Sequence, residues 1–338
     1  MKNKDKLLEV KNLRTYFDTR RGLAKAVDGV SFDVYKGETL GIVGESGCGK
    51  SITSLSILNL VPQPKGKIYG GEILLHRDND EIIDIAKLKR TGKKMKDIRR
   101  KDTAMIFQDP MSSLSPVYTV GSQIMEGIML SHDVDKIEAR GMAIEMLRKV
   151  GISPPEQRIN DYPYQLSGGM NQRAMIAVAL SSNPSLLIAD EPTTALDVTV
   201  EAQILELMEE LQQEYKMSIM FISHDLDVIG EISDRVVVMY TGKVVEVAEV
   251  EDLFYNPSHP YTQGLLQSIP KIGRKKELKP ISGSVPQIYN LPDACHFAPR
   301  CPHKMDICTK KEPPVFDVGE GHQSKCWLYE EGGKRNEG

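Results

Sequence analysis

The residues best suited to chemistry form a glycine-rich octet, Gly44–Ser51, with the sequence GESGCGKS. It fits the pattern G-x-x-x-x-G-K-[ST], in which backbone N–H groups surround phosphates, a lysine reaches the terminal phosphates and a hydroxyl binds Mg²⁺. An apolar run, Leu40–Val43, precedes the octet and a helical pattern follows it, so bound phosphates would meet a helix N-terminus. The octet therefore predicts a phosphate-binding P-loop, with Lys50 on the β- and γ-phosphates and Ser51 on the metal. The predicted nucleotide contacts are Gly44, Glu45, Ser46, Gly47, Cys48, Gly49, Lys50, Ser51 and Ile52.

A second candidate for chemistry, Ser185–Glu191, is an apolar run that ends in two carboxylates. In-line attack on a γ-phosphate needs a metal to neutralise charge and a group that orients or deprotonates water. We expect Asp190 to bind the metal and Glu191 to act on the water, as in a Walker B element. Alone, such a run could equally be a strand that ends in a solvated acidic turn. The octet upstream favours the catalytic interpretation.

Between these two motifs lies Leu166–Arg173, LSGGMNQR, which places a serine and two glycines at the start of a predicted helix. The N–H groups of a helix start predict a second anion site. LSGGM followed by QR, shortly before the two carboxylates, resembles the signature motif of ABC-type ATPases. The resemblance continues in the family's order with Gln108 of IFQDP (the Q-loop), Ala195–Asp197 (the D-loop) and His224 of FISHD (the switch histidine).

This resemblance implies a site shared between two chains. In ABC ATPases two nucleotide domains meet head to tail, and each ATP lies between the P-loop of one and the signature of the other. Here the signature residues Ser167, Gly168 and Gly169, together with Asp197, would contact the ATP of the partner.

The resemblance also implies roles for the remaining motifs. Gln108 would complete the shell of the Mg²⁺ ion or of the water, beside the metal ligands Ser51 and Asp190. His224 would contact the γ-phosphate. An aromatic residue upstream of the P-loop usually stacks on adenine in this family, and we expect Phe17 in that role, with Tyr16 as the alternative.

The character of the chain changes after Tyr255, where prolines become frequent and periodic apolar runs become rare. Four of the five cysteines lie in the last 44 residues, and so small a module would need a staple. In a reducing compartment these cysteines favour a metal or cofactor site over disulfides. The spacing C-x5-C-x6-C-x17-C lacks the C-x-x-C pairs typical of zinc, while four thiolates can also hold an iron–sulfur cluster. Burial as small apolar side chains is a further alternative. The candidate ligands are Cys295, Cys301, Cys308 and Cys326.

This C-terminal part carries a second resemblance. The stretches Asn256–Thr262 (NPSHPYT), Gly264–Leu266 and Pro299–Pro302, with the cysteines around them, resemble the C-terminal extension of ATPase subunits from dipeptide and oligopeptide importers. The Q-loop stretch IFQDPMSSLSP resembles the same subfamily. The resemblance favours a 4Fe-4S cluster over zinc, while nearby histidines leave a mixed site open. These histidines are His296, His303 and His322.

Together these patterns predict an α/β fold of the P-loop NTPase, ABC nucleotide-binding type: a mixed sheet core, an antiparallel β subdomain and a helical subdomain, followed by a loop-rich cysteine module. We expect the nucleotide-binding domain at residues 1–255, its helical subdomain at about 110–182 and the extension at 256–338. The expected strands lie at 40–43, 186–189, 218–222 and 236–239, and a hairpin turn is expected at Thr241-Gly242. The expected helices lie at 51–60, 136–150, 169–180 and 198–214.

The charge balance of 43 basic and 47 acidic residues gives a net charge of −4 and no general reason to expect nucleic acid as a partner. The most basic stretch, Lys87–Lys101, has nine basic residues and one acidic residue but no interleaved aromatics, which favours a solvated surface. The N-terminus lacks a signal peptide, and no stretch approaches the roughly 20 apolar residues of a membrane span. We therefore expect a cytosolic chain.

The resemblances imply an ATPase subunit, peripheral at the cytoplasmic face of the cell membrane, that powers import of dipeptides or oligopeptides. The implied partners are two permease subunits, a second ABC ATPase subunit, identical or not, and an extracytoplasmic peptide-binding protein. The alternatives are an ABC ATPase for another solute such as nickel, and a soluble ABC ATPase of iron–sulfur assembly. Only 117 positions separate Lys50 from Ser167, which leaves no room for the insertions of ABC proteins that act on DNA or ribosomes.

Overall fold

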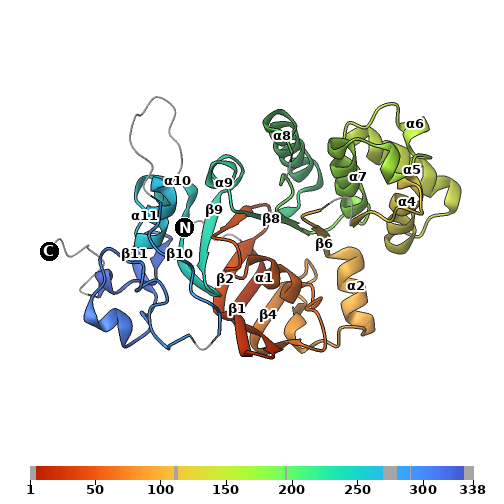
Figure 1. The fold of residues 1–338 in the computed structure, drawn as a ribbon. Coiled ribbons are helices and arrows are strands. Elements are labelled where there is room, and N and C mark those ends of the chain that lie inside the picture. Colours follow the sequence, from red (N-terminus) through yellow and green to blue (C-terminus); the bar gives the residue numbers. More distant parts are fainter. Residues whose placement is uncertain (1–4, 110–112, 195, 269–279, 290, 331–338) are drawn as a thin grey trace. The chain divides into compact units, whose positions relative to one another are not determined.

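A computed structural model describes residues 5–109, 113–194, 196–268, 280–289 and 291–330. The chain divides into two compact units. The first unit consists of Met1–Lys87 and Ser223–Gly338, and the second consists of Leu88–Ile222. Figure 1 shows the elements of both units. The P-loop lies in the first unit, and the signature and the paired carboxylates lie in the second.

An antiparallel sheet in the first unit has the strand order β2-β1-β4-β5. Its strands are β1 (Lys6–Thr19), β2 (Gly22–Tyr35), β4 (Gly66–His76) and β5 (Ile82–Asp84). Strand β2 alternates buried with more exposed residues over much of its length, as expected of a sheet with one face on a core, whereas β1 begins with four consecutive buried residues, Leu7–Val10. The helix that follows the P-loop, α1 (Lys50–Ile57), is tied to this sheet because the hydroxyls of Thr15 and Ser56 share a hydrogen bond of 2.8 Å. The short 3-10 helix η1 (Ile85–Lys87) follows β5.

The first unit also contains a run of strands in the order β11-β12-β10-β9-β3. They are β3 (Thr39–Val43), β9 (Arg235–Tyr240), β10 (Lys243–Glu249), β11 (Phe316–Gly319) and β12 (His322–Ser324). β3 and β9 are parallel, and every residue of β3 is buried, which explains its continuous apolar sequence. The predicted turn at Thr241-Gly242 is confirmed: both residues have positive φ, at 42° and 78°, and β9 pairs antiparallel with β10.

The helices of the C-terminal half of the first unit are short. They are α9 (Leu226–Ile232), α10 (Val250–Tyr255), α11 (Pro260–Gln267), η3 (Asp306–Thr309) and η4 (Trp327–Tyr329). The C-terminal segment is not made of loops alone, since its strand β12 pairs with β10. This segment therefore extends a sheet of the unit that carries the P-loop.

The second unit has three parallel strands in the order β8-β7-β6 and a group of helices. The strands are β6 (Thr103–Ile106), β7 (Leu186–Asp190) and β8 (Ser218–Ser223). The helices are α2 (Lys93–Lys101), α4 (Val120–Ser131), α5 (Lys136–Lys149), α6 (Pro155–Arg158), α7 (Gly168–Leu180), α8 (Val198–Tyr215) and the 3-10 helix η2 (Pro163–Gln165). Helices α4 to α7 gather in one group (Figure 1). The glycine at 127 lets α4 approach the end of α7, because a Cβ there would lie 2.1 Å from the Ser181 hydroxyl.

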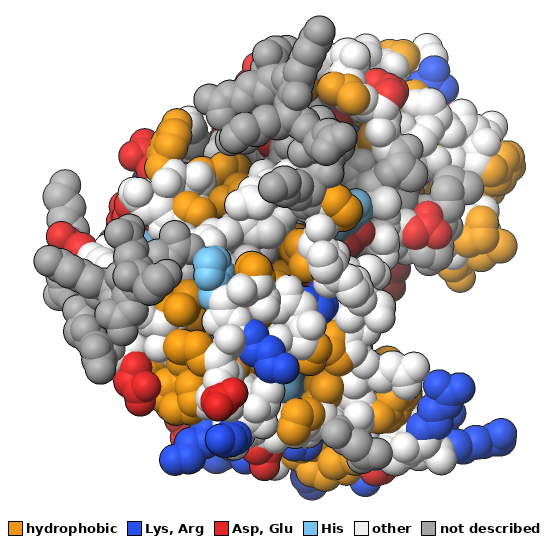
Figure 2. All heavy atoms as spheres, turned by 60° about the vertical axis from the view of Figure 1, so that its left-hand side comes forward, with side chains coloured by type: hydrophobic (Ala, Val, Ile, Leu, Met, Phe, Trp, Pro, Cys, Tyr) orange, Lys and Arg blue, Asp and Glu red, His pale blue; other side chains and the backbone are white. Residues whose placement is uncertain are grey.

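The fold class expected from the sequence is confirmed, and the helices and strands named there are found within three residues of their expected ends. The domain boundaries at 255 and 256 stay a prediction. Within the described ranges no helix is both long and apolar enough to cross a membrane. On the face drawn in Figure 2, acidic and basic side chains are scattered among apolar and uncharged ones.

Candidate nucleotide-binding site

The conformation of the P-loop depends on glycines at two tight positions. Gly44 has φ of 156°, and a Cβ there would lie 2.2 Å from the carbonyl oxygen of Met239. Gly49 has φ of 105°, and a Cβ there would lie 2.3 Å from the carbonyl oxygen of Ala26. No other residue could follow this path without displacing backbone. The two glycines of the pattern G-x-x-x-x-G are thus explained by the backbone of the neighbouring strands β2 and β9, which leaves no room for a side chain at either position.

Lys50 lies across the loop that it follows. Its side chain is buried, and Nζ donates a hydrogen bond of 2.7 Å to the carbonyl oxygen of Gly44. Helix α1 begins at Lys50, and its N-cap, Gly49, has no side chain to cap the helix. The helix start is therefore open to an anion that its backbone N–H groups and its dipole would favour.

Three further residues of the predicted nucleotide contacts differ in exposure. The side chain of Cys48 points into the protein and is 1% exposed, so its contribution to a site is through the backbone. Tyr16 is also buried, and its hydroxyl donates a hydrogen bond of 2.6 Å to Asp28. Phe17 is half-buried and has no such hydrogen bond to make. These environments favour Phe17 over Tyr16 for stacking on a base, and the assignment stays a prediction.

In the second unit the paired carboxylates lie where β7 ends. Asp190 is the last residue of that strand and is 6% exposed. Glu191 follows with φ of 50°, a left-handed conformation that is strained for a residue with a side chain. Its backbone N–H donates a hydrogen bond of 2.9 Å to the carbonyl oxygen of Ile222 at the end of β8. Strain of this kind is often found at functional residues.

The structure brings the Q-loop glutamine to the second of these carboxylates. Nε2 of Gln108 donates a hydrogen bond of 2.9 Å to Oε2 of Glu191. The hydroxyl of Thr194 donates a hydrogen bond of 3.2 Å to the same oxygen. Sequence reasoning did not single out Thr194, although a hydroxyl three residues after a carboxylate in a turn is a signal that could have found it. Together these contacts fix the direction of the Glu191 carboxylate.

The signature and the D-loop each provide the N-cap of a helix. The Ser167 hydroxyl accepts a hydrogen bond of 3.3 Å from the N–H of Met170 at the start of α7. Asp197 accepts a hydrogen bond of 3.0 Å from the N–H of Val200 at the start of α8. The two helix starts touch, because a Cβ at Gly169 would lie 3.1 Å from a methyl group of Val200. Of the predicted D-loop, Ala195 lies outside the described residues.

The predicted switch histidine belongs to the first unit. His224 lies between β8 and α9, and its side chain is exposed. The next residue, Asp225, caps α9 by accepting a hydrogen bond of 2.8 Å from the N–H of Asp227. The turn that carries His224 is therefore fixed by the start of a helix.

Two residues from the C-terminal segment reach the P-loop, and sequence reasoning gave them no role. The guanidinium of Arg300 forms an ion pair with the carboxylate of Glu45, with Nη1 and Oε2 2.7 Å apart. The hydroxyl of Tyr261 accepts a hydrogen bond of 2.8 Å from the backbone N–H of Glu45. The sequence contains no local signal for these contacts, because 255 and 216 positions separate the partners.

The four C-terminal cysteines line one small cavity, together with His259, His303 and several apolar side chains. All four are free thiols. Burial raises the pKa of Cys301 to about 11 and that of Cys326 to about 12, and neighbouring cysteines add to both shifts. Without a cation the thiols of Cys301 and Cys326 therefore stay protonated at neutral pH. Among the residues with described positions, no three His, Cys, Asp or Glu side chains are arranged to hold a metal ion.

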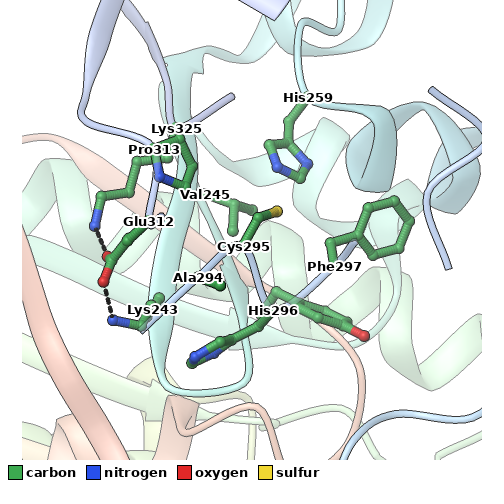
Figure 3. A pocket seen from close by; sticks show the side chains of 11 residues that line it. Lys243, Val245, His259, Ala294, Cys295, His296, Phe297, Glu312, Pro313 and Lys325 are labelled. Atoms are coloured by element: carbon green, nitrogen blue, oxygen red, sulfur yellow. Dashed lines mark hydrogen bonds and ion pairs between the residues drawn. The ribbon is translucent and has the colours of Figure 1, made fainter. Parts of the chain in front are cut away.

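Figure 3 shows a neighbouring pocket, in which Glu312 lies between Lys243 and Lys325. Nζ of Lys243 is 2.7 Å from Oε2 of Glu312, and Lys325 pairs with the other oxygen. Burial disfavours the charged form of Glu312, but the hydrogen bonds from the two lysines outweigh it and hold its pKa below the ordinary value. The lysine charges on this wall are thus compensated within the protein, while the thiol of Cys295 lies among apolar and aromatic side chains (Figure 3).

The comparisons with known proteins agree with these motifs. The family described as ABC transporter matches residues 27–194, and the family described as oligopeptide/dipeptide transporter, C-terminal region, matches residues 245–308. A solved dimeric ATP-binding cassette, bound to ADP and Pi in a post-hydrolysis state, has 28% sequence identity and a TM-score of 0.63, over 72% of this chain and 99% of its own. The P-loop, the carboxylates after β7 and the signature at the start of α7 thus belong to an ABC-type nucleotide-binding domain.

Two relatives from Bacillus subtilis (strain 168) match almost the whole chain. The oligopeptide transport ATP-binding protein AppD is 53% identical over 97% of this chain and 98% of its own length. The dipeptide transport ATP-binding protein DppD is 47% identical over 97% of this chain and 96% of its own length. The chain therefore belongs to the ABC transporter ATPases, and within them to the family of these transport ATP-binding proteins.

Proposed function

We propose that this chain is the ATP-hydrolysing subunit that powers import of dipeptides or oligopeptides through a membrane ABC transporter. The observation that carries the proposal is the similarity beyond the nucleotide-binding domain, where residues 245–308 match the C-terminal region of oligopeptide/dipeptide transporters. Relatives named for peptide transport also match along nearly all of the chain. These similarities favour peptides over the two alternatives, import of nickel and iron–sulfur assembly.

The residues of the site fit the binding of Mg²⁺ and ATP. Mg²⁺ prefers oxygen ligands, and the hydroxyl of Ser51, the carboxylate of Asp190 and the side-chain amide oxygen of Gln108 would supply them. Bound Mg²⁺ would neutralise charge on the phosphates. Lys50 and the N–H groups at the start of α1 bind the β- and γ-phosphates, and His224 contacts the γ-phosphate.

Glu191 is proposed to orient the attacking water and accept its proton. Its carboxylate already receives hydrogen bonds from Gln108 and Thr194, which hold it in one direction. A positioned base of this kind typically contributes a factor of about 10²–10⁴ to a rate.

The signature residues Ser167–Gly169 and the D-loop residue Asp197 are proposed to act on the ATP of a second ATPase subunit, which is either identical or related. Binding of two ATP molecules would close the pair, and hydrolysis would reopen it. The closure would drive two permease subunits at the cytoplasmic face of the cell membrane, where this chain is peripheral. A peptide-binding protein outside the cell would deliver the peptide.

The decisive experiment for this function is reconstitution in liposomes with candidate permease subunits and a peptide-binding protein. We expect ATP turnover that rises when a dipeptide or oligopeptide is added. The Lys50→Ala variant should abolish that turnover, because the β- and γ-phosphates lose their cation. Turnover that no peptide stimulates, with any permease, would contradict the proposal.

The cysteine cavity is proposed to hold a 4Fe-4S cluster that organises the C-terminal segment. The donors support a soft metal, since four thiols and no carboxylate line the cavity. Structural zinc sites commonly take their cysteines as C-x-x-C pairs, which the spacing C-x5-C-x6-C-x17-C lacks. This sequence spacing and the similarity of residues 245–308 to oligopeptide/dipeptide transporters favour a cluster over zinc. The candidate ligands are Cys295, Cys301, Cys308 and Cys326.

Iron and zinc analysis of anaerobically purified protein tests this cofactor. We expect iron, acid-labile sulfide and visible absorbance, all lost in the variant with serine at the four cavity cysteines. Cys48→Ser is the matched control, because that cysteine is buried elsewhere and should leave the iron content unchanged. Protein without iron would overturn the cluster, and stoichiometric zinc would establish the alternative.

A further inference from the structure

The P-loop of this chain is held by a side chain from the far end of the sequence. Arg300 donates two hydrogen bonds to Glu45, the second residue of the octet: Nη1 to Oε2 at 2.7 Å and Nη2 to Oε1 at 3.0 Å. The side chain of Arg300 is 4% exposed and that of Glu45 is 27% exposed. A bidentate pair whose guanidinium is buried is stronger and better oriented than an ordinary surface ion pair.

The guanidinium is fixed on its other edges as well. Nε donates a hydrogen bond of 3.0 Å to the carbonyl oxygen of Ser282, and Nη1 donates one of 3.3 Å to the hydroxyl of Tyr240. The backbone N–H of Glu45 donates to the Tyr261 hydroxyl. Both the side chain and the backbone of Glu45 are therefore held by the C-terminal half of the first unit.

A buried aromatic cluster supports these contacts. The rings of Tyr240, Tyr261 and Phe297 are fully buried, and their centroids lie 4.6 to 5.4 Å apart. Such ring pairs contribute beyond the apolar area that they bury, and they restrict rotation of each ring. The hydroxyl of Tyr261 is therefore presented to the P-loop from a rigid base.

The segment that carries Arg300 runs between two of the cavity cysteines. From Cys295 to Cys301 it is a series of tight turns, in which the N–H of Ala298 donates to the carbonyl oxygen of Cys295 at 3.1 Å. The N–H of Arg300 donates to the carbonyl oxygen of Phe297 at 2.9 Å. Contacts that hold Cys295 and Cys301 in place therefore also hold the backbone of Arg300 in place.

We propose that Arg300 and Tyr261 are positioning residues that hold the P-loop in its phosphate-binding conformation, so that the C-terminal segment sets the affinity for ATP. A phosphate-binding loop binds more tightly when its N–H groups are ordered in advance, because binding then costs less conformational entropy. This inference rests on the proposed function in one respect, that Gly44–Ser51 bind the phosphates of ATP.

The test compares two arginines in full-length protein. Arg300→Gln removes the contact with the P-loop. Arg235→Gln is the matched control, since Arg235 is also mostly buried and pairs with both oxygens of Glu38, but does not touch the P-loop. The dissociation constant of ATP is measured by calorimetry, the turnover by phosphate release, and the folding of each variant by its melting temperature.

We expect Arg300→Gln to raise the dissociation constant and KM of ATP about tenfold, within the range typical of coupling between two sites. The value of kcat should change less than KM. The dissociation constant of ATP for Arg300→Lys should lie between those of the unmodified chain and Arg300→Gln. Lysine keeps the positive charge but cannot donate two parallel hydrogen bonds to the carboxylate. Arg235→Gln should lower the melting temperature and leave the affinity unchanged.

A double-variant cycle separates positioning from a general loss of structure. Glu45→Gln and Arg300→Gln remove the same contact, so the double variant should bind ATP no more weakly than Arg300→Gln alone. If Arg300→Gln does not fold, Tyr261→Phe removes only the acceptor for the Glu45 N–H and should weaken ATP binding in the same direction.

Three results would overturn the inference: unchanged affinity in Arg300→Gln and Tyr261→Phe, an equal loss in Arg235→Gln, or fully additive effects in the double variant. These outcomes leave the proposed function in place as long as the unmodified chain binds ATP. Absence of ATP binding by the unmodified chain would instead contradict the proposed function itself.

Discussion

Glu191 combines a strained backbone with a side chain that two other residues direct. Its φ of 50° turns the chain sharply after β7, and Gln108 and Thr194 both donate to one of its carboxylate oxygens. The strained backbone and the directed carboxylate thus coincide at the residue that we propose as the base for the attacking water.

Replacement of Glu191 by glutamine should lower ATP turnover by about 10²–10⁴-fold, because the amide cannot accept the proton of the water. ATP binding should persist, since the phosphate contacts lie in the P-loop. Turnover is measured by phosphate release and binding by calorimetry. Glu206→Gln, an exposed carboxylate on α8, is the control and should have no effect on either quantity. Turnover that survives in Glu191→Gln would exclude Glu191 as the base.

Glu9 provides a prediction on pH. The hydrogen bond from Lys6 outweighs burial and, with Lys11 and His76, lowers the pKa of Glu9 from 4.5 to about 2. Because the folded pKa lies below the unfolded one, the stabilisation by Glu9 is complete above pH 4.5 and is lost as the pH falls toward about 2. Glu9→Gln should therefore be less stable than the unmodified chain at pH 7 and equally stable near pH 2. The urea midpoints of the unmodified chain and of Glu9→Gln, measured across this pH range, check the prediction. A difference between the two midpoints that does not change with pH would contradict it.

At the scale of elements, the start of helix α7 combines a structural role with a proposed functional one, and both fall on Ser167. Ser167 caps the helix through its hydroxyl, and it is also the first residue of the proposed contact with the ATP of the partner. A change of this side chain should therefore alter the stability of the helix and, if the proposed function holds, the turnover of ATP. The two effects can be separated, because different side chains can serve as caps.

Ser167→Ala should cost about 1 kcal/mol of unfolding free energy through loss of the cap. Ser167→Asp should restore that stability, since aspartate caps as well as serine does. It should still abolish ATP turnover, because its carboxylate would repel the γ-phosphate. Denaturant unfolding and phosphate release measure the two quantities. A variant Ser167→Asp with normal turnover would place the signature away from the phosphates.

The elements were more predictable than their contacts. The helix at 168–180 and the strand at 186–190 could be predicted because glycine, serine and continuous apolar runs act locally. The strands β11 and β12 could not, since they are three or four residues long and depend on pairing with β10. Likewise the sequence identified Glu191 and Gln108 separately, but their hydrogen bond joins residues 83 positions apart.

At the scale of the whole molecule, each copy carries both a P-loop and a signature, so under the proposed function two identical copies would supply two complete sites in a head-to-tail pair. In the Glu191→Gln variant hydrolysis is blocked, and the ATP-bound pair should persist. We expect the mass of this variant, measured by light scattering, to double when ATP and Mg²⁺ are added and to return to the mass of one chain when they are removed. The same variant with Ser167→Asp should remain at the mass of one chain. A mass that stays unchanged when ATP and Mg²⁺ are added would contradict pairing between identical copies.

The division of the chain into units also has a consequence for synthesis. The second unit is a continuous stretch, Leu88–Ile222, whereas the first unit combines Met1–Lys87 with Ser223–Gly338. Domains generally fold as units while the chain emerges from the ribosome. The second unit can therefore be complete while the first still lacks β9, β10 and the residues that hold the P-loop. The nucleotide site is thus among the last parts of the newly made protein to form, and a chain released early by the ribosome would keep every nucleotide-binding motif up to its break but lack the contacts that order its P-loop.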